Sequence, residues 1–205
     1  WNTAGTWDCN HVPATSDTVT VAASHTVTMD VASNVLGTIT INGTLNTSGT
    51  NYGLSGTTLT IGAAGTVTAN GSTITLSGTS GTLFTLTAGG AFTAGTSTVV
   101  FSGNGDATLN SGTITFNSIT SSGTGTKTLG AALDLEDTLT LSAGTLDVSG
   151  TNYGITAKSW TDSGAGTFTE GTGTVTFDVA GGTINSNETF ENVTINHAGT
   201  TTLGA

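Results

Sequence analysis

The chain has 205 residues, a formal net charge of −11 and only two basic side chains, Lys127 and Lys158. Charged residues make up 7% of the chain, against about a quarter in an ordinary globular protein, while Thr contributes 50 residues and Gly 31. Nucleic acid and anionic membrane surfaces are poor partners, because both are bound through clusters of Lys and Arg, and no stretch approaches the ~20 apolar residues of a transmembrane helix.

The composition favours strands throughout. Thr is β-branched and prefers strands, whereas Gly prefers tight turns. Strong helix formers such as Glu, Lys and Met are rare, and the sequence contains neither Arg nor Gln. A chain this rich in Gly, Thr and Ser could instead be disordered, but its Val, Ile, Leu and Phe recur too regularly for that. We expect an all-β protein with almost no helix.

The opening residues 1–17, "WNTAGTWDCNHVPATSD", precede the first alternating segment and are predicted to form an N-terminal cap. Trp1 and Trp7 are large enough to cover the end of a β-structure, whose unpaired edge would otherwise invite aggregation. The alternative is that the two rings stack on a ligand such as a sugar. Cys9 is the single cysteine, so we expect a buried, small apolar side chain, with an intermolecular link as the alternative.

From Thr18 onward the chain is dense in Thr-x-Thr triplets with an apolar middle residue. Examples are Thr18–Thr20, Thr26–Thr28, Thr38–Thr40, Thr58–Thr60, Thr73–Thr75, Thr85–Thr87 and Thr138–Thr140. Because strand side chains alternate between two faces, both Thr of a triplet face one way and the Val, Ile or Leu between them faces the other. The triplets predict short strands, apolar within and hydroxylated outside, that end at Gly, Ser or Asn.

Three phrases of the sequence return later in the chain. "GTLNTSGTNYG" at 43–53 returns as "GTLDVSGTNYG" at 144–154, "GTSTVVF" at 95–101 as "GTGTVTF" at 171–177, and "GTKTLGA" at 125–131 as "GTTTLGA" at 199–205. The offsets between the copies are 101, 76 and 74 residues. Because the offset falls by about 25 after the first phrase, the first copy carries a segment of roughly 25 residues that the second lacks. This length is typical of one repeat unit in solenoids and propellers. We interpret this segment as one structural unit and the offset of 76 as close to three units. The eleven-residue phrases would be equivalent corners, with Tyr52 and Tyr153 packed over them or, alternatively, in contact with another subunit.

A unit of about 25 residues built from short strands predicts one coil of a parallel β-helix, in which neighbouring coils pair at ~4.8 Å. We predict a single β-solenoid domain over residues 1–205, with about eight coils on the arithmetic of the repeats. Residues 1–17 form its cap, 18–142 the coils with the first repeat copy, and 143–205 a second, incomplete copy. A β-propeller is the rival fold, but its four-stranded blades need ~40 to 50 residues. The handedness is left open.

The sequence offers little catalytic chemistry. In "ALDLED", Asp134 and Glu136 share one strand face, a pattern we interpret as a solvated acidic turn rather than the carboxylate pair of a glycosidase. Asp106 in "SGNGDATL" follows its Gly at the wrong spacing for a calcium repeat, and Cys9 with His11 lack a second ligand pair at zinc spacing. We expect no enzymatic activity, no metal and no cofactor.

Glycans are a further class of partner. Five Asn-x-Ser/Thr sequons occur, at Asn42, Asn46, Asn70, Asn187 and Asn192. In a secreted host they could carry glycans, although a chain this rich in Asn and Thr produces sequons by chance.

The opening "WNTAGTWDCNHVPATSDTVTVAASHTVTMD" places Trp1, Gly5, Trp7, Pro13 and Asp17 ahead of an alternating strand. It resembles the start of solenoid segments in large secreted prokaryotic surface proteins, the autotransporter- and haemagglutinin-like adhesins. "GTFTEGTGTVTF", "NETFENVTI" and "GTTTLGA" resemble the repeats of the same proteins. The resemblance covers most of the chain. It implies a β-helical scaffold, an extracellular or cell-surface location, and a role in an adhesin, filament or surface layer.

The last phrase, "GTTTLGA", ends where its first copy continues into "ALDLEDTLTLSAGTLDVSG". The final coil therefore looks unfinished, and Leu203 within it is a candidate for an interface. We predict a non-catalytic structural module of an extracellular filament or adhesin, which stacks head to tail on itself or continues into neighbouring coils of a longer chain. The alternative is an ice- or carbohydrate-binding solenoid that uses its Thr-x-Thr faces, although the irregular spacing of the triplets would spread them over several faces.

Overall fold

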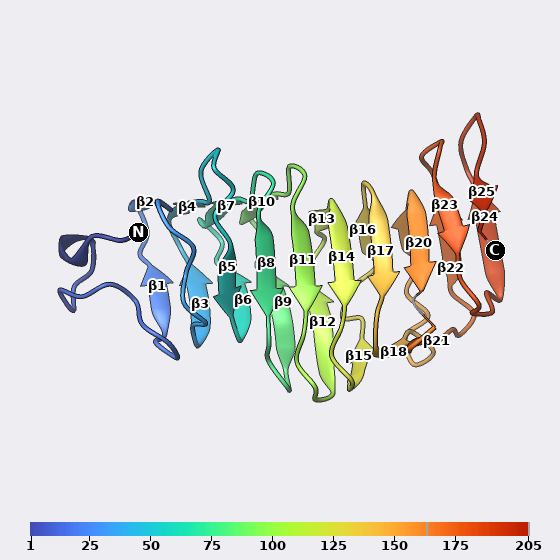
Figure 1. Ribbon diagram of the computed structural model, residues 1–205, viewed down its shortest axis with the longest axis horizontal. Coiled ribbons are helices and arrows are strands. Elements are labelled where there is room, and N and C mark those ends of the chain that lie inside the picture. The colour runs from blue at the N-terminus through green and yellow to red at the C-terminus, as the bar shows by residue number, and fades with distance from the viewer. Residues whose placement is uncertain (163, 205) are drawn as a thin grey trace.

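In the computed structural model, which describes residues 1–162 and 164–204, short strands wind into a parallel β-solenoid of about nine coils. The chain begins near one end of the rod, and its last described strands lie at the opposite end (Figure 1). Among the described residues the only helix is the 3₁₀ turn η1 (Ala4–Thr6), and no helix is long and apolar enough to cross a membrane. The predicted all-β parallel β-helix is confirmed.

Each complete coil contributes one strand to each of three sides, and all paired strands run parallel. The first side is sheet A, with β1 (Val19–Val21), β3 (Thr38–Ile41), β6 (Thr58–Ile61), β9 (Thr82–Leu86), β12 (Ala107–Ser111), β15 (Thr126–Thr128), β18 (Gly144–Asp147) and β21 (Gly166–Thr169).

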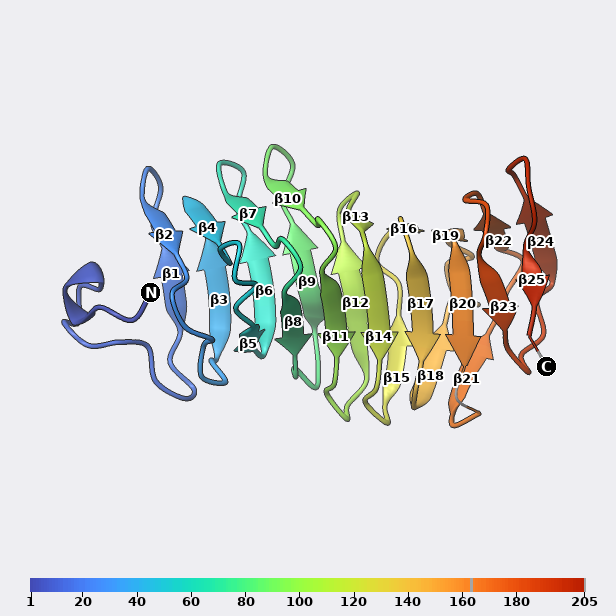
Figure 2. The ribbon, with the colours of Figure 1, turned by 45° about the horizontal axis from the view of Figure 1, so that its top comes forward.

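The second side consists of two sheets that follow one another along the rod (Figure 2). Sheet B contains β2 (Thr26–Thr28), β4 (Thr44–Asn46), β7 (Thr66–Thr68) and β10 (Ala91–Thr93). Sheet D contains β13 (Thr115–Phe116), β16 (Leu133–Leu135), β19 (Ile155–Ala157), β22 (Thr174–Phe177) and β24 (Asn192–Ile195). The third side is sheet C, with β5 (Leu54–Gly56), β8 (Thr73–Leu76), β11 (Thr98–Phe101), β14 (Ser118–Ser121), β17 (Thr138–Leu141), β20 (Ser159–Asp162), β23 (Thr183–Asn185) and β25 (Thr202–Leu203).

The coils are shorter than the repeat arithmetic predicted. Val19 pairs with Ile39 and Ile39 pairs with Leu59, so both steps match the ~20 residues that form one coil of the stack. The step from Leu59 to Phe84 is longer, because additional residues enlarge the turns between strands. The predicted coil length of ~25 residues is wrong, since ~20 residues form a coil and there are about nine coils rather than eight. Lengthening a turn costs little loop-closure entropy, so a few long coils are tolerated within the stack.

The repeated phrases do not occupy equivalent corners, and that prediction is also wrong. The first eleven-residue phrase includes β4 of sheet B, whereas the second includes β18 of sheet A. The other two echoes also change sides, from β11 of sheet C to β22 of sheet D and from β15 of sheet A to β25 of sheet C. Each strand of the second repeat copy therefore lies on a neighbouring side of the solenoid from its counterpart in the first copy. The sequence offsets between the echoes are for this reason not whole numbers of coils. The last residue of the third echo, Ala205, lies outside the described residues.

The eleven-residue phrase fits two different corners because it encodes a local turn. Asn46 accepts a hydrogen bond from the backbone N–H of Ser48 at 2.7 Å, as Asp147 does from Ser149 at 2.9 Å. Asn51 and Asn152 both have positive φ angles, 61° and 54°, which Asn tolerates better than most residues. Their side-chain oxygens accept hydrogen bonds from backbone N–H groups of the following coil. Tyr52 and Tyr153 follow these Asn residues and are partly buried against the core.

The core is a continuous apolar column inside the coils, lined by the middle residues of the triplets. Two aromatic groups interrupt the aliphatic stacks: Phe84, Phe92 and Phe116, and further along Trp160, Phe168 and Phe190. Burying each large apolar side chain contributes roughly 1.5–3 kcal/mol, which offsets the ordering entropy of a Gly-rich chain. The Thr residues of the triplets face outward, as the alternation predicted.

Candidate functional sites at the two ends

Residues 1–17 cover the N-terminal end of the solenoid. Trp1 is 5% exposed, and its α-amino group donates a hydrogen bond to the carbonyl of Thr28 at 3.0 Å and lies 3.3 Å from Asp30. The indole N–H of Trp7 donates to the carbonyl of Trp1 at 3.0 Å, and the two rings meet edge to face with centroids 5.1 Å apart. The backbone N–H of Asn2, and then the N-terminal ammonium, lower the pKa of Asp30. Trp1 fills the end of the core and Trp7 packs over it.

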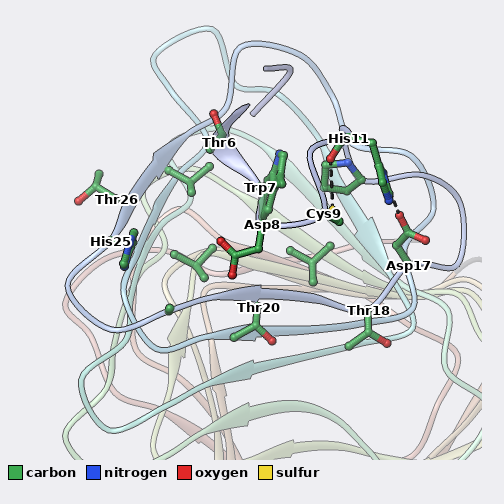
Figure 3. A pocket seen from close by; sticks show the side chains of 15 residues that line it. Thr6, Trp7, Asp8, Cys9, His11, Asp17, Thr18, Thr20, His25 and Thr26 are labelled. Carbon is green, nitrogen blue, oxygen red and sulfur yellow. Dashed lines mark hydrogen bonds and ion pairs between the residues drawn. The ribbon is translucent and has the colours of Figure 1, made fainter. Parts of the chain in front are cut away.

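The cover is incomplete, because a cleft of about 500 Å³ lies between residues 6–13 and the first coil (Figure 3). Every residue from Thr18 to Ala22 lines the cleft. Because these residues include both outward-facing Thr and inward-facing Val, the cleft follows the backbone edge of β1 rather than one of its faces. In the part of the chain that the structure describes, β1 is the outermost strand of sheet A and pairs only with β3. Among the described residues, no backbone hydrogen bond joins residues 1–17 to β1. We name this space the N-terminal cleft.

Acidic and imidazole side chains surround the N-terminal cleft. Asp8 lies between His25 on one side and Asp17 on the other (Figure 3), and within the described residues it makes no hydrogen bond or ion pair. Asp17 accepts a hydrogen bond from the backbone N–H of Ala14 at 2.8 Å, and its carboxylate lies 3.9 Å from Nδ1 of His11. Neither Lys of the chain lines the cleft. The cleft therefore favours cations over anions.

Cys9 is exposed in the same segment, so the prediction of a buried cysteine is wrong. Its sulfur lies 3.6 Å from the carbonyl oxygen of His11. The reason is that residues 8–11 stand off the first coil rather than forming part of it (Figure 3). In the described ranges 1–162 and 164–204, no three His, Cys, Asp or Glu side chains are grouped so that they could hold a metal ion.

The C-terminal end lacks a comparable cover in the part of the chain that the structure describes. Val193 pairs in register with buried Val175, Ile195 with buried Phe177, and Leu203 with partly buried Ile184, so all three continue the inner columns. They are nevertheless 47%, 49% and 76% exposed, respectively. β24 and β25 are the outermost strands of sheets D and C. The last coil thus presents bare apolar side chains beside unpaired strand edges, and we name it the C-terminal face.

Carboxylates gather close to the C-terminal face. Burial raises the pKa of Glu188, and the nearby carboxylates of Asp162 and Glu170 raise it further, although a hydrogen bond from the backbone N–H of Phe168 opposes the shift. Glu191 and Asp178 are exposed in the same coils. Like charges around an apolar surface weaken association at low ionic strength and less so at high ionic strength.

Of the remaining sequence candidates, Glu136 is exposed, whereas Asp134 and Asp106 are engaged in local structure. Asp134 accepts a hydrogen bond from the Thr115 hydroxyl at 2.7 Å, with Leu133 and Leu135 facing inward as predicted. Asp106 accepts a hydrogen bond from the backbone N–H of Thr126 at 2.8 Å. These carboxylates brace neighbouring coils, which is a structural role.

The two lysines differ in a way that the composition could not show. Lys158 lies 3.6 Å from Asp137 in a partly exposed ion pair. Lys127 faces inward from β15 and is completely buried, and its ammonium donates a hydrogen bond to the carbonyl of Gly105 at 2.7 Å. Burial lowers the pKa of Lys127, while Asp106 opposes that shift. Lys127 therefore does not present a cation to a ligand at the surface.

The five sequons are also unequal. The amide of Asn70 donates to the side-chain oxygen of Asn46 at 3.0 Å, and the amide of Asn192 donates to the carbonyl of Thr172 at 3.2 Å. A glycan on any of these nitrogens would break a contact between coils. Asn187, by contrast, is exposed between β23 and β24.

Sequence comparison places most of the chain in one family model. The model of the G8 domain matches residues 6–162, a range that includes the N-terminal cleft and ends before the C-terminal face. No curated protein and no solved structure matches the chain.

Proposed function

The chain belongs to the G8 domain family, and on that premise we propose that it is a non-catalytic structural module of an extracellular filament or cell-surface adhesin. G8 domains are typically found in extracellular proteins, and the β-solenoid suits a structural module. A rod of stacked coils holds its two ends a fixed distance apart, which is the property a spacer or filament unit needs.

The observation that carries the proposal is the C-terminal face. Val193, Ile195 and Leu203 occupy core positions of the last coil yet remain exposed, beside strand edges that have no partner among the described residues. An exposed apolar strand edge is a template for association. We propose that this face associates end to end with a second copy. Residues 1–17 cover the other end, so the contact we favour joins two C-terminal faces.

Sedimentation velocity and electron microscopy test the association. The wild-type chain should associate as its concentration rises, and more strongly at high salt, because salt screens the surrounding carboxylates. The triple variant Val193→Thr, Ile195→Thr and Leu203→Thr should remain monomeric. The matched control is Val35→Thr, since Val35 is also an exposed large apolar residue, 54% exposed, but lies near the N-terminal end.

Particle length then distinguishes the geometries. Rods of twice the monomer length would support pairing of two C-terminal faces, whereas long filaments would support the head-to-tail stacking expected from the sequence. A wild-type chain that stays monomeric at every concentration and salt level would overturn end-to-end self-association and leave neighbouring coils of a longer chain as the partner.

The absence of catalysis is part of the proposal. It is supported by the engagement of Asp106 and Asp134 in hydrogen bonds between coils and by the burial of Lys127. A panel of neutral and acidic polysaccharides incubated with the protein should yield no new reducing ends and no unsaturated products. Either product at a rate proportional to protein concentration would show that the protein is an enzyme.

A second candidate function rests on the outer surface of sheet A. Thr20, Thr40, Thr60 and Thr85 stack in register, and the hydroxyls of Thr38 and Thr58 lie 3.4 Å apart beside them. Such an array suits ordered water or a crystalline carbohydrate. The triplet Thr26–Thr28 lies on sheet B instead, as the irregular spacing predicted. Inhibition of ice recrystallisation at micromolar protein would favour this function, and no inhibition would remove its ice-binding form.

A further inference from the structure

We propose that the N-terminal cleft binds an extended, basic peptide segment of a partner protein, which adds to sheet A as a strand along the edge of β1. The proposal concerns the end opposite the C-terminal face and does not depend on self-association. It rests on three independent features of the cleft: a free strand edge, an apolar lining, and a negative charge.

The strand edge is free and its polarity is defined. The carbonyl of Val21 accepts hydrogen bonds from Asn42 and Gly43 of the second coil, so the backbone of Val21 faces β3. Alternate residues of a strand direct their backbone groups to opposite sides, so the N–H and carbonyl of Thr20 face the cleft. Main-chain hydrogen bonds of this kind give affinity when a peptide adds to a sheet edge.

The floor of the cleft fits a strand rather than a globular ligand. Val19, Val21 and Val27 line it and end the inner column of the first coil. These valines are at most 7% exposed, so the inner side chains of a peptide strand on β1 would pack against Trp7 at the mouth of the cleft. Trp7 closes the cleft on the opposite side. A volume of about 500 Å³ lies in the range of specific binding sites.

The negative charge of the cleft favours a peptide segment that carries basic side chains. Asp8 has no partner within the described residues, and Asp17 lines the same space to one side of it (Figure 3). Lys or Arg side chains flanking the apolar positions would pair with these carboxylates, and a cation can also lie against the indole of Trp7. Acidic segments would meet like charge.

Charge also excludes a second copy of this chain as the occupant. The sequence contains only two basic side chains. Lys127 is buried, and Lys158 is paired with Asp137. The strands of the C-terminal face carry no basic residue, and Glu188 and Glu191 lie beside them. The occupant is therefore a basic segment that residues 1–205 do not supply.

Fluorescence anisotropy with short labelled peptides tests the proposal on the full chain. The probe is Lys-Val-Thr-Val-Lys with blocked termini. Its first control, Glu-Val-Thr-Val-Glu, keeps the strand propensity and reverses the charge. Its second control is the probe N-methylated at its three central residues, which keeps the side chains and the charge and removes the backbone donors that could pair with Thr20 in either strand orientation. We expect saturable binding of the probe alone, weakened by salt.

Two variants locate the site. Thr20→Pro removes the N–H that faces the cleft and leaves the pairing of Val19 and Val21 with β3, because proline is tolerated on edge strands. It should abolish binding, while Thr20→Val should bind as wild type. Asp8→Asn should weaken binding about threefold to fivefold. Asp178→Asn, the same change at an exposed site near the other end, should have no effect. Unchanged circular dichroism and melting show that each variant is folded.

The possible results separate cleanly. Binding of the probe that is lost with Thr20→Pro and reduced with Asp8→Asn supports strand addition. Equal binding of the Glu peptide or of the N-methylated peptide overturns it, as does no binding at millimolar probe. Preferential binding of the chain's own segment 192–196 would also overturn it and would instead identify the cleft as the acceptor in head-to-tail stacking.

Discussion

At the N-terminal end Trp1 fills the last position of the apolar column, whereas at the C-terminal end Val193, Ile195 and Leu203 leave theirs bare. Both ends consist of the same Thr-rich coil, so the difference lies in the segment 1–17 that precedes the first strand. Covering the column end does not require covering the strand edge, because Trp1 is buried while the edge of β1 remains open to the cleft. A solenoid end can therefore be stabilised and still be available for binding.

The largest expected difference between the ends is in stability. Trp1→Ala should lower the free energy of unfolding by about 3 kcal/mol, the low end of the range for a buried Trp or Phe truncated to Ala. Leu203→Ala should change it by less than about 0.5 kcal/mol, because its side chain is already in water. Urea denaturation at concentrations where the chain is monomeric measures both. A comparable loss for Leu203→Ala would mean that the C-terminal face is covered in solution.

A smaller effect is expected midway between the ends, where Lys127 replaces an apolar residue of the column. Lys127→Met should raise the free energy of unfolding by about 1 kcal/mol, because it removes a buried charge and keeps the volume. Lys158→Met, which removes a partly exposed ion pair, should change stability very little.

The pH dependence provides the check on Lys127. Its pKa is lowered in the folded state from the ordinary value of 10.5, so the unfolded chain binds more protons between the two values. Wild-type stability should therefore rise with pH in that window, and the penalty should disappear above 10.5. The difference between wild type and Lys127→Met should shrink in parallel. A constant difference would mean that the pKa of Lys127 is the same in the folded and the unfolded chain.

The Thr-x-Thr triplets made most of the fold predictable, because the alternation of a strand is a local property. The same pattern contained a signal that was missed: Thr126-Lys127-Thr128 places Lys127 at an inner position as surely as Thr18-Val19-Thr20 places Val19. The coil length was not predictable in the same way. Extra residues lengthen the turns and leave the strands unchanged, so coils differ in length. The offset between two echoes also includes the shift of the second copy to a different side of the solenoid, so it does not give the length of a coil.

The N-terminal cleft could not be derived from the sequence. Most residues of 6–13 line it together with Thr18–Ala22, yet nothing in their composition indicates that the first segment stands away from β1. The prediction of a cap addressed Trp1 and Trp7 and overlooked Asp8, which the structure places in the open space.

The smallest expected effect is that the two ends respond oppositely to acid. The pKa of Asp30 at the covered end is lowered from 3.8, so its contribution to stability is complete above that value and is lost as the pH falls through the folded pKa. The pKa of Glu188 near the bare end is raised from 4.5, so its cost is complete at neutral pH and absent below 4.5. Asp30→Asn should therefore destabilise the chain at neutral pH, whereas Glu188→Gln should stabilise it by about 0.5 kcal/mol or less, as expected for a single polar substitution near the surface. Denaturation followed from acidic to neutral pH measures both differences. If Glu188→Gln also destabilised the chain at neutral pH, the hydrogen bond from Phe168 would outweigh burial, and the carboxylates would be holding the C-terminal face together rather than straining it.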